Sequence, residues 1–109
     1  MKLHEVQFRV KTFVEKHQIE TSPEMRLLDL ISEIGELSKE MLKANNYGKE
    51  VFQLSSDQHG KWTEELGDAF FSLICLANST HVDLDNALHQ VLNKYALRLQ
   101  VKGDAGSGQ

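Results

Sequence analysis

The 109-residue sequence contains one cysteine, one proline and few aromatic side chains, and it lacks a long apolar run. The single cysteine, Cys75, excludes an internal disulfide framework, and its apolar neighbours predict a small core residue. No stretch of about 18 apolar residues is present, and no basic segment precedes an apolar one, so neither membrane insertion nor export is expected. The predicted location is therefore the cytoplasm.

The sequence also has no excess of basic over acidic residues. The 12 Lys and Arg residues are outnumbered by 16 Asp and Glu residues, and the formal net charge is -4. This balance gives no positive footprint for a nucleic-acid polymer, although a free nucleotide held through a bridging cation remains compatible with it. The sequence contains no P-loop, no G-x-G-x-x-G, no nucleophile elbow and no reactive-cysteine arrangement.

Alternating strand patterns are nearly absent, which predicts an all-α fold. Helical periodicity predicts a bundle of about four helices in one domain, residues 1–102, followed by a disordered Gly- and Ser-rich tail, residues 103–109. The first helix is expected over 3–17, the second ends near residue 43, the third spans 61–79 and the fourth 84–101. A polar connector, 49–60, precedes the third helix. Short helices leave a small core, so we expect a homo-oligomer.

Two start signals compete at the second helix, namely Thr21 with Glu24, and Ser22 followed by Pro23. In the third helix, the segment 69–77 contains one clearly polar side chain, Ser72, so this helix is expected to be buried on almost all sides. The fourth helix carries an apolar stripe that is expected to join the core: Leu84, Ala87, Leu88, Val91, Leu92, Tyr95 and Leu99.

Two carboxylate couples stand out, Glu33 with Glu36 and Glu65 with Asp68, each spaced i, i+3. On a helix this spacing places both members on one face, one turn apart. Acids on exposed helix faces are common, and either couple alone favours that plain interpretation. Both couples, however, flank apolar faces of consecutive helices, and an unpaired carboxylate is costly to bury. Together they predict a metal site between two helices.

The ligand chemistry limits which metals fit the predicted site. Carboxylates without a neighbouring His or Cys form an all-oxygen site, which favours Mg²⁺ or Mn²⁺ over zinc or copper. Dinuclear iron bundles use Glu-x-x-His on two helices, and neither couple has a His at the matching position. Mg²⁺ bound by few carboxylates completes its shell with waters and phosphate oxygens, so a nucleotide polyphosphate is the expected ligand.

These residues resemble a known family. The E-x-x-E of EIGE, the E-x-x-D of EELGD and the following LANSTHVDLDNAL are similar to the MazG-like nucleotide pyrophosphohydrolases of the all-α nucleotide pyrophosphatase superfamily. The resemblance extends from about Leu27 to Arg98. Many members have a further Glu immediately before the first couple, and Ser32 occupies that position here, which puts one auxiliary acid in doubt.

The resemblance implies a Mg²⁺-dependent enzyme that converts a nucleoside triphosphate to the monophosphate and pyrophosphate, as a house-cleaning activity on the nucleotide pool, and works as a homodimer or homotetramer. It assigns the metal to Glu33, Glu36, Glu65 and Asp68. One of these four could also act as general base, and we choose Glu36 as the candidate, although spacing alone does not separate a ligand from a base. The candidate substrate contacts are Lys94, Arg98, Asn78, Asn93 and Trp62, and core packing of Trp62 is favoured over stacking on a base. Two alternatives remain: a phosphoribosyl-ATP pyrophosphohydrolase, and a non-catalytic helical module that binds nucleotides or partners.

Overall fold

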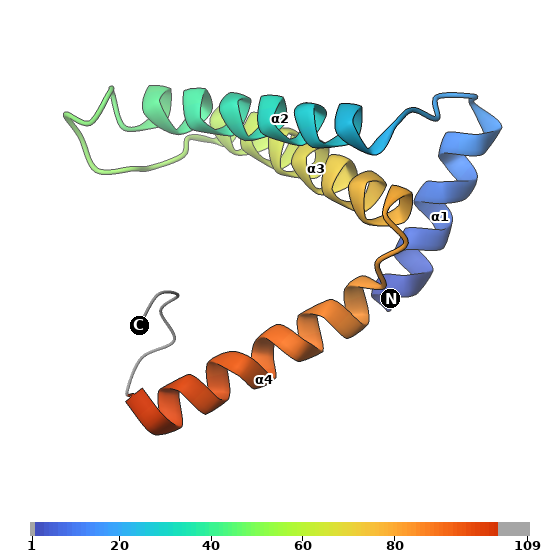
Figure 1. Cartoon of the computed structure of the whole chain (residues 1–109). Coiled ribbons are helices and arrows are strands. Elements are labelled where there is room, and N and C mark those ends of the chain that lie inside the picture. Colours follow the sequence, from blue (N-terminus) through green and yellow to red (C-terminus); the bar gives the residue numbers. More distant parts are fainter. Residues whose placement is uncertain (1, 103–109) are drawn as a thin grey trace.

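The structure, a computed structural model, describes residues 2–102 as an all-α chain (Figure 1). No strand occurs in this range, which confirms the predicted fold class. The predicted tail, 103–109, lies outside the described residues. The helices are α1 (Leu3–Lys16), α2 (Pro23–Ala44), α3 (Ser56–Ser79) and α4 (Leu84–Lys102).

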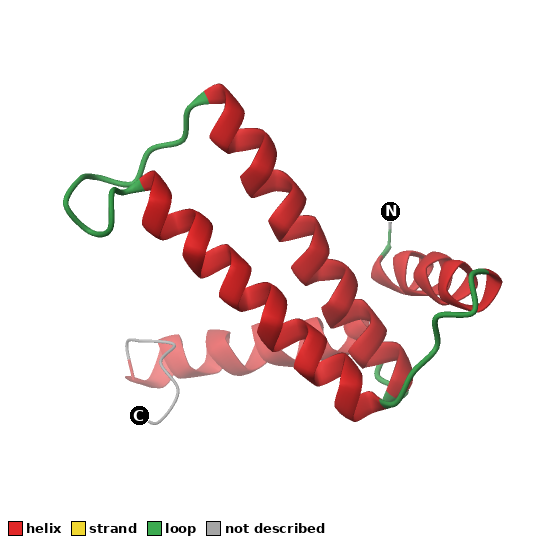
Figure 2. Cartoon of the chain, turned by 90° about the horizontal axis from the view of Figure 1, so that it is seen from above, coloured by secondary structure: helices red, strands yellow, loops and turns green. Residues whose placement is uncertain are grey.

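The centre of the fold is an antiparallel hairpin of α2 and α3, which run side by side in both views (Figures 1 and 2). The helix α1 packs across the C-terminal end of α3, and α4 starts beside α1 and then diverges from the hairpin. The radius of gyration is 17.0 Å, whereas a compact chain of this length has about 13 Å. The single chain is therefore open, with one long helix projecting from it.

Side-chain caps fix the starts of α2 and α3. Ser22 caps α2, because its Oγ accepts a hydrogen bond from the Met25 amide, and Pro23 takes the first helical position. At α3 the prediction of a connector up to residue 60 is wrong, since the helix begins at Ser56. Ser55 and Gln58 form a reciprocal capping box there, a Ser-x-x-Gln signal that was present in the sequence.

A buried glutamine joins α1 to the end of α3 and the start of α4. Gln7 of α1 is 8% exposed, and its Nε2 donates to Asn78 Oδ1 at 3.0 Å and to the Val82 carbonyl oxygen at 2.8 Å. The backbone amide of Leu84, the first residue of α4, donates to Gln7 Oε1 at 2.9 Å. Asn78 Nδ2 in turn donates to the Gln7 carbonyl oxygen. This junction holds α1, the end of α3 and the start of α4 together.

Large apolar side chains remain exposed on the single chain. On α3, Leu66, Phe70 and Leu73 are 40 to 46% exposed, so the prediction that this helix is buried on almost all sides is wrong for one chain. The predicted stripe of α4 is also largely open, because α4 leaves the hairpin. Its most exposed members are Leu88, Leu92 and Leu99. None of the helices between residues 3 and 102 has the length and apolarity that crossing a membrane requires.

We expect Gln7→Ala to lower the free energy of unfolding by about 2 kcal/mol, because it leaves three part-buried groups without their hydrogen-bond partner. Urea denaturation at one fixed protein concentration measures this change. The matched control is Thr12→Ala, whose exposed hydroxyl bonds only to the Phe8 carbonyl oxygen within α1. Equal stability of the two variants would contradict a junction at Gln7.

Candidate functional site

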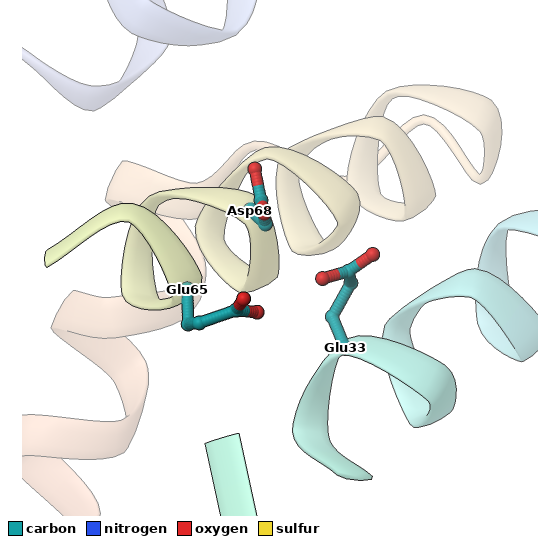
Figure 3. Close-up of side chains that lie close together, drawn as sticks. All are labelled: Glu33, Glu65 and Asp68. Atoms are coloured by element: carbon teal, nitrogen blue, oxygen red, sulfur yellow. The ribbon is translucent and has the colours of Figure 1, made fainter. Parts of the chain in front are cut away.

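Three carboxylates from two helices converge at the middle of the hairpin. Glu33 comes from α2, and Glu65 and Asp68 come from α3 (Figure 3). Each residue offers a carboxylate oxygen, and these three oxygens lie within 4.8 Å of one another. We call these three residues the acidic triplet. In the close-up the carboxylates of Glu33 and Glu65 point toward each other across the gap between the helices.

Burial differs sharply within the acidic triplet. Glu65 is 5% exposed, Glu33 is half-buried and Asp68 is exposed. Glu65 lies on the buried face of α3 with Ala69 and Ser72, at helical spacing, so the packing of α3 against α2 encloses it. The site therefore has a closed side formed by Glu65 and an open side formed by Asp68.

The face of α2 that packs against α3 carries acidic and apolar side chains together. Glu33 is half-buried there, and so are the apolar neighbours Leu30 and Leu37. Other apolar side chains of α2 are open to solvent, since Leu27, Ile31 and Ile34 are 47 to 59% exposed. The acids thus flank a small apolar contact, while much of the apolar face of the single chain points to solvent.

The crowding of like charges perturbs Glu33. Partial burial raises the pKa of the Glu33 carboxyl, and the negative charges of Asp68 and Glu65 raise it further. Glu36 and Asp29 add smaller contributions in the same direction. At neutral pH the metal-free site thus holds more negative charge than its surroundings favour.

One lysine offsets part of this charge. Lys61 Nζ lies 3.0 Å from Glu65 Oε1, an i, i+4 ion pair along α3. The hydrogen bond to Glu65, together with its charge, raises the pKa of the Lys61 ammonium. The sequence analysis missed this residue, although its place four residues before Glu65 on the same helix was a usable signal.

The donor set suits a hard divalent cation. The acidic triplet offers carboxylate oxygens only, with no His or Cys in the group, and oxygen ligands of this kind are those preferred by Mg²⁺ and Mn²⁺. A cation would also relieve the repulsion that raises the pKa of Glu33. The residues present therefore fit the predicted metal, with the exposed side at Asp68 left open to water and ligand.

Glu36, the fourth predicted ligand, lies outside the acidic triplet. It is one turn along α2 from Glu33, half-buried, and close enough for its charge to act on Glu33. The structure thus brings together three of the four predicted carboxylates and keeps the fourth beside them. Their roles as ligands, and that of Glu36 as a base, stay predictions.

The predicted basic contacts lie on the diverging helix α4. Lys94 Nζ lies 5.2 Å from the centre of the Tyr95 ring, and the Arg98 guanidinium carbon lies 5.9 Å from it. Asn93 is exposed on the same helix. Because α4 leaves the hairpin, the fold of one chain directs these residues away from the acidic triplet (Figure 1).

The two remaining candidates have packing partners within the chain. Both ends of the Asn78 amide are bonded to Gln7, which gives Asn78 a structural role at the helix junction. Trp62 is half-buried and meets Phe52 edge-on, with ring centres 5.7 Å apart, in agreement with the favoured packing interpretation. Contact of either residue with a nucleotide stays a prediction.

A separate cavity of about 470 Å³ lies between α1 and the C-terminal end of α3. Gln7, Asn78, Cys75 and Arg26 contribute to its lining. Arg26 is 9% exposed and donates to the Ile19 carbonyl oxygen, so it fixes the α1–α2 connection. Cys75 is buried as predicted, and burial raises the pKa of its thiol, so it is a packing residue and a poor nucleophile. The cavity adjoins the helix junction and shares no lining residue with the acidic triplet.

We expect Glu33→Gln to raise the melting temperature of the metal-free chain at pH 7. The folded-state pKa of Glu33 is raised, so folding holds this proton more tightly, and ionisation above about pH 4.3 costs stability. The gain should vanish as the pH falls below the unfolded-state pKa, where both forms are neutral. Thermal scans in EDTA across pH 3 to 8 measure it, with exposed Glu64→Gln as the control. A lower melting temperature at pH 7 would contradict the crowding of charge at Glu33.

Comparison with known proteins agrees with this arrangement of helices. Residues 21–100 match the model of the MazG nucleotide pyrophosphohydrolase domain. The uncharacterized protein YpjD of Bacillus subtilis (strain 168) is 35% identical over 77 residues, which cover 71% of this chain and 67% of that protein.

Two crystal structures have the same fold. The Bacillus-conserved MazG protein, a nucleotide pyrophosphohydrolase, matches with a TM-score of 0.69 and 30% identity over 87% of this chain and 89% of that one. The putative pyrophosphatase YPJD from Bacillus subtilis matches with a TM-score of 0.70 and 29% identity, over 90% of this chain and 96% of that one. The family match spans most of the residues that form the hairpin, the acidic triplet and α4. The chain therefore belongs to the MazG nucleotide pyrophosphohydrolase family, whose members are hydrolases that act on nucleotides.

Proposed function

We propose that this chain is a Mg²⁺-dependent nucleoside triphosphate pyrophosphohydrolase that releases the monophosphate and pyrophosphate, with Mn²⁺ as a possible substitute. The observation that carries the proposal is the acidic triplet, in which two helices contribute carboxylate oxygens within 4.8 Å of one another. Such a group suits a cation that binds phosphates, since phosphate alone would be repelled by it. House-cleaning of the nucleotide pool, in the cytoplasm, is the predicted context.

Each carboxylate has a proposed role. Glu33, Glu65 and Asp68 would hold the metal, and Glu65, which is almost fully buried, would anchor it at the closed side. The bound metal would neutralise and orient the phosphate oxygens of the substrate. Glu36 lies one turn along α2 from Glu33, and its charge acts on Glu33 more strongly than that of Asp29 does, so we assign Glu36 as the base that accepts the proton of the attacking water. Addition of that water across the phosphoanhydride bond between the α- and β-phosphates would break this bond and give the monophosphate and pyrophosphate.

We expect Glu36→Gln and Asp68→Asn each to lower pyrophosphate release by about 100-fold or more, since loss of a general base alone has effects of that size. The assay is a panel of standard and modified nucleoside triphosphates, with phosphoribosyl-ATP included, in Mg²⁺ and in EDTA. The matched control is Glu50→Gln, an exposed carboxylate on the α2–α3 connection, which should leave the rate unchanged.

Different outcomes of this assay separate the alternatives. Turnover of phosphoribosyl-ATP without turnover of any nucleoside triphosphate would show that the protein is a phosphoribosyl-ATP pyrophosphohydrolase. Nucleotide binding without pyrophosphate release from any substrate would favour a non-catalytic binding module and overturn the proposed activity. If metal-dependent release of pyrophosphate persists in both variants, the roles assigned to Glu36 and Asp68 are wrong.

We also propose that the protein assembles with further copies of itself, as a homodimer or homotetramer. The chain exposes 8050 Å², whereas a compact monomer of 12.4 kDa exposes about 6,100 Å². The eight residues outside the described range account for about 1,000 Å² of the difference at most. The excess that remains is about 900 Å² per copy, enough for two copies to bury about 1,800 Å², the area of a stable, specific interface.

The character of the open surface also favours a second copy. It includes the outer face of α2 and the stripe of α4, where large apolar side chains are about half exposed. Gly35 and Gly67 lie within helices, and a Cβ at either position would meet no atom of this chain. Glycine in a helix interior costs about 1 kcal/mol relative to alanine. Close approach of another copy would account for that cost.

The expected mass in solution at micromolar concentration is therefore a multiple of 12.4 kDa. Light scattering after size exclusion measures it. Leu92→Glu, in the exposed part of the α4 stripe, should lower the mass or prevent folding, whereas the neighbouring Gln90→Glu should do neither, because Gln90 is polar and exposed. A monomeric wild-type protein would overturn the assembly.

A further inference from the structure

The contact between Lys61 and Glu65 lies inside the candidate metal centre. The ammonium nitrogen is 3.0 Å from Glu65 Oε1, and the side chains differ in exposure, with 49% for Lys61 and 7% for Glu65. The lysine therefore reaches from solvent to the most buried carboxylate of the acidic triplet. Its position corresponds to that of a cation already bound to one of the three acids.

The helix itself does not account for this pair. A Lys placed four residues before a Glu is in the less favourable order for an i, i+4 pair along a helix. Exposed pairs of this kind contribute little to stability, since solvent screens them. The better explanation is electrostatic, because Glu65 is almost fully buried next to two further carboxylates and needs a compensating positive charge.

We propose that Lys61 is an internal counter-ion of the acidic triplet, which a divalent cation must release from Glu65 when it binds. The inference rests on the proposed metal site. A cation bound by Glu65 and the ammonium of Lys61 would repel each other at this distance. Half of the lysine side chain already contacts solvent, so the released ammonium can be hydrated without rearrangement of α3.

If a metal displaces Lys61 from Glu65, the substitution Lys61→Met should strengthen metal binding and weaken the stability of the metal-free protein. Without Lys61 the metal has no internal competitor, so Lys61→Met should bind Mn²⁺ about three- to tenfold more tightly than wild type. The metal-free variant should melt at a lower temperature than wild type, because Glu65 loses its partner. A lysine with only a structural role would lower the melting temperature and leave the affinity for the metal unchanged.

The binding of Mn²⁺ alone, followed by electron paramagnetic resonance of the free ion, tests this without any nucleotide. The matched control is Lys43→Met, which removes a lysine paired with Glu40 at 3.5 Å, outside the acidic triplet, and should leave the Mn²⁺ affinity within twofold of wild type. Lys61→Arg, which keeps the charge, should keep the wild-type affinity to within about twofold.

A second measurement follows the lysine directly. The ¹³Cε resonance of Lys61 in the wild-type protein should move to the position of a solvated lysine as Mg²⁺ is added, while that of Lys43 stays in place. Tight Mn²⁺ binding with equal affinity in wild type and Lys61→Met, or a Lys61 resonance that Mg²⁺ leaves unchanged, would overturn the counter-ion role alone. No binding of Mn²⁺ by the wild type would overturn the proposed metal centre together with it.

Discussion

Mutual repulsion of carboxylates held between two packed helices is the constraint on which the rest of this structure depends. The acidic triplet lies where α2 packs against α3, with Glu33 beside the half-buried Leu30 and Leu37 and with Glu65 almost fully enclosed. Burying these carboxylates carries an electrostatic cost that apolar side chains in the same contact would not carry. A positive charge is needed to compensate it, whether from Lys61 or from a metal.

This orientation of α2 also explains the surface of the chain. A helix has a limited circumference, so acids at the α3 contact take positions that apolar residues would otherwise fill, and Leu27, Ile31 and Ile34 lie exposed on other sides. The chemistry of the site and the incomplete core are thus two results of one arrangement. The single chain leaves these apolar side chains unburied, and they form part of the surface that the proposed assembly would cover.

Local patterns in the sequence predicted the helices and the pairing of the acids, because i, i+3 spacing fixes which side chains share a face. The same rules could not predict which element a face packs against. The stripe of α4 was expected in the core and is largely open, since periodicity identifies an apolar face and says nothing of its partner. Gln7 was missed because its bonds join residues 71 to 77 positions apart. The early start of α3 was predictable from Ser55 and Gln58.

The junction at Gln7 has a consequence for the order in which the chain folds. The acidic triplet is formed by a hairpin whose helices are close in sequence, so its contacts close short loops. The bonds of Gln7 instead close a loop of more than 70 residues, and such long-range contacts form slowly. We therefore expect the hairpin to fold first, with its acids already facing each other, and α1 and α4 to dock afterwards. Local opening of the junction would then free both ends of the chain while the hairpin that carries the acidic triplet persists.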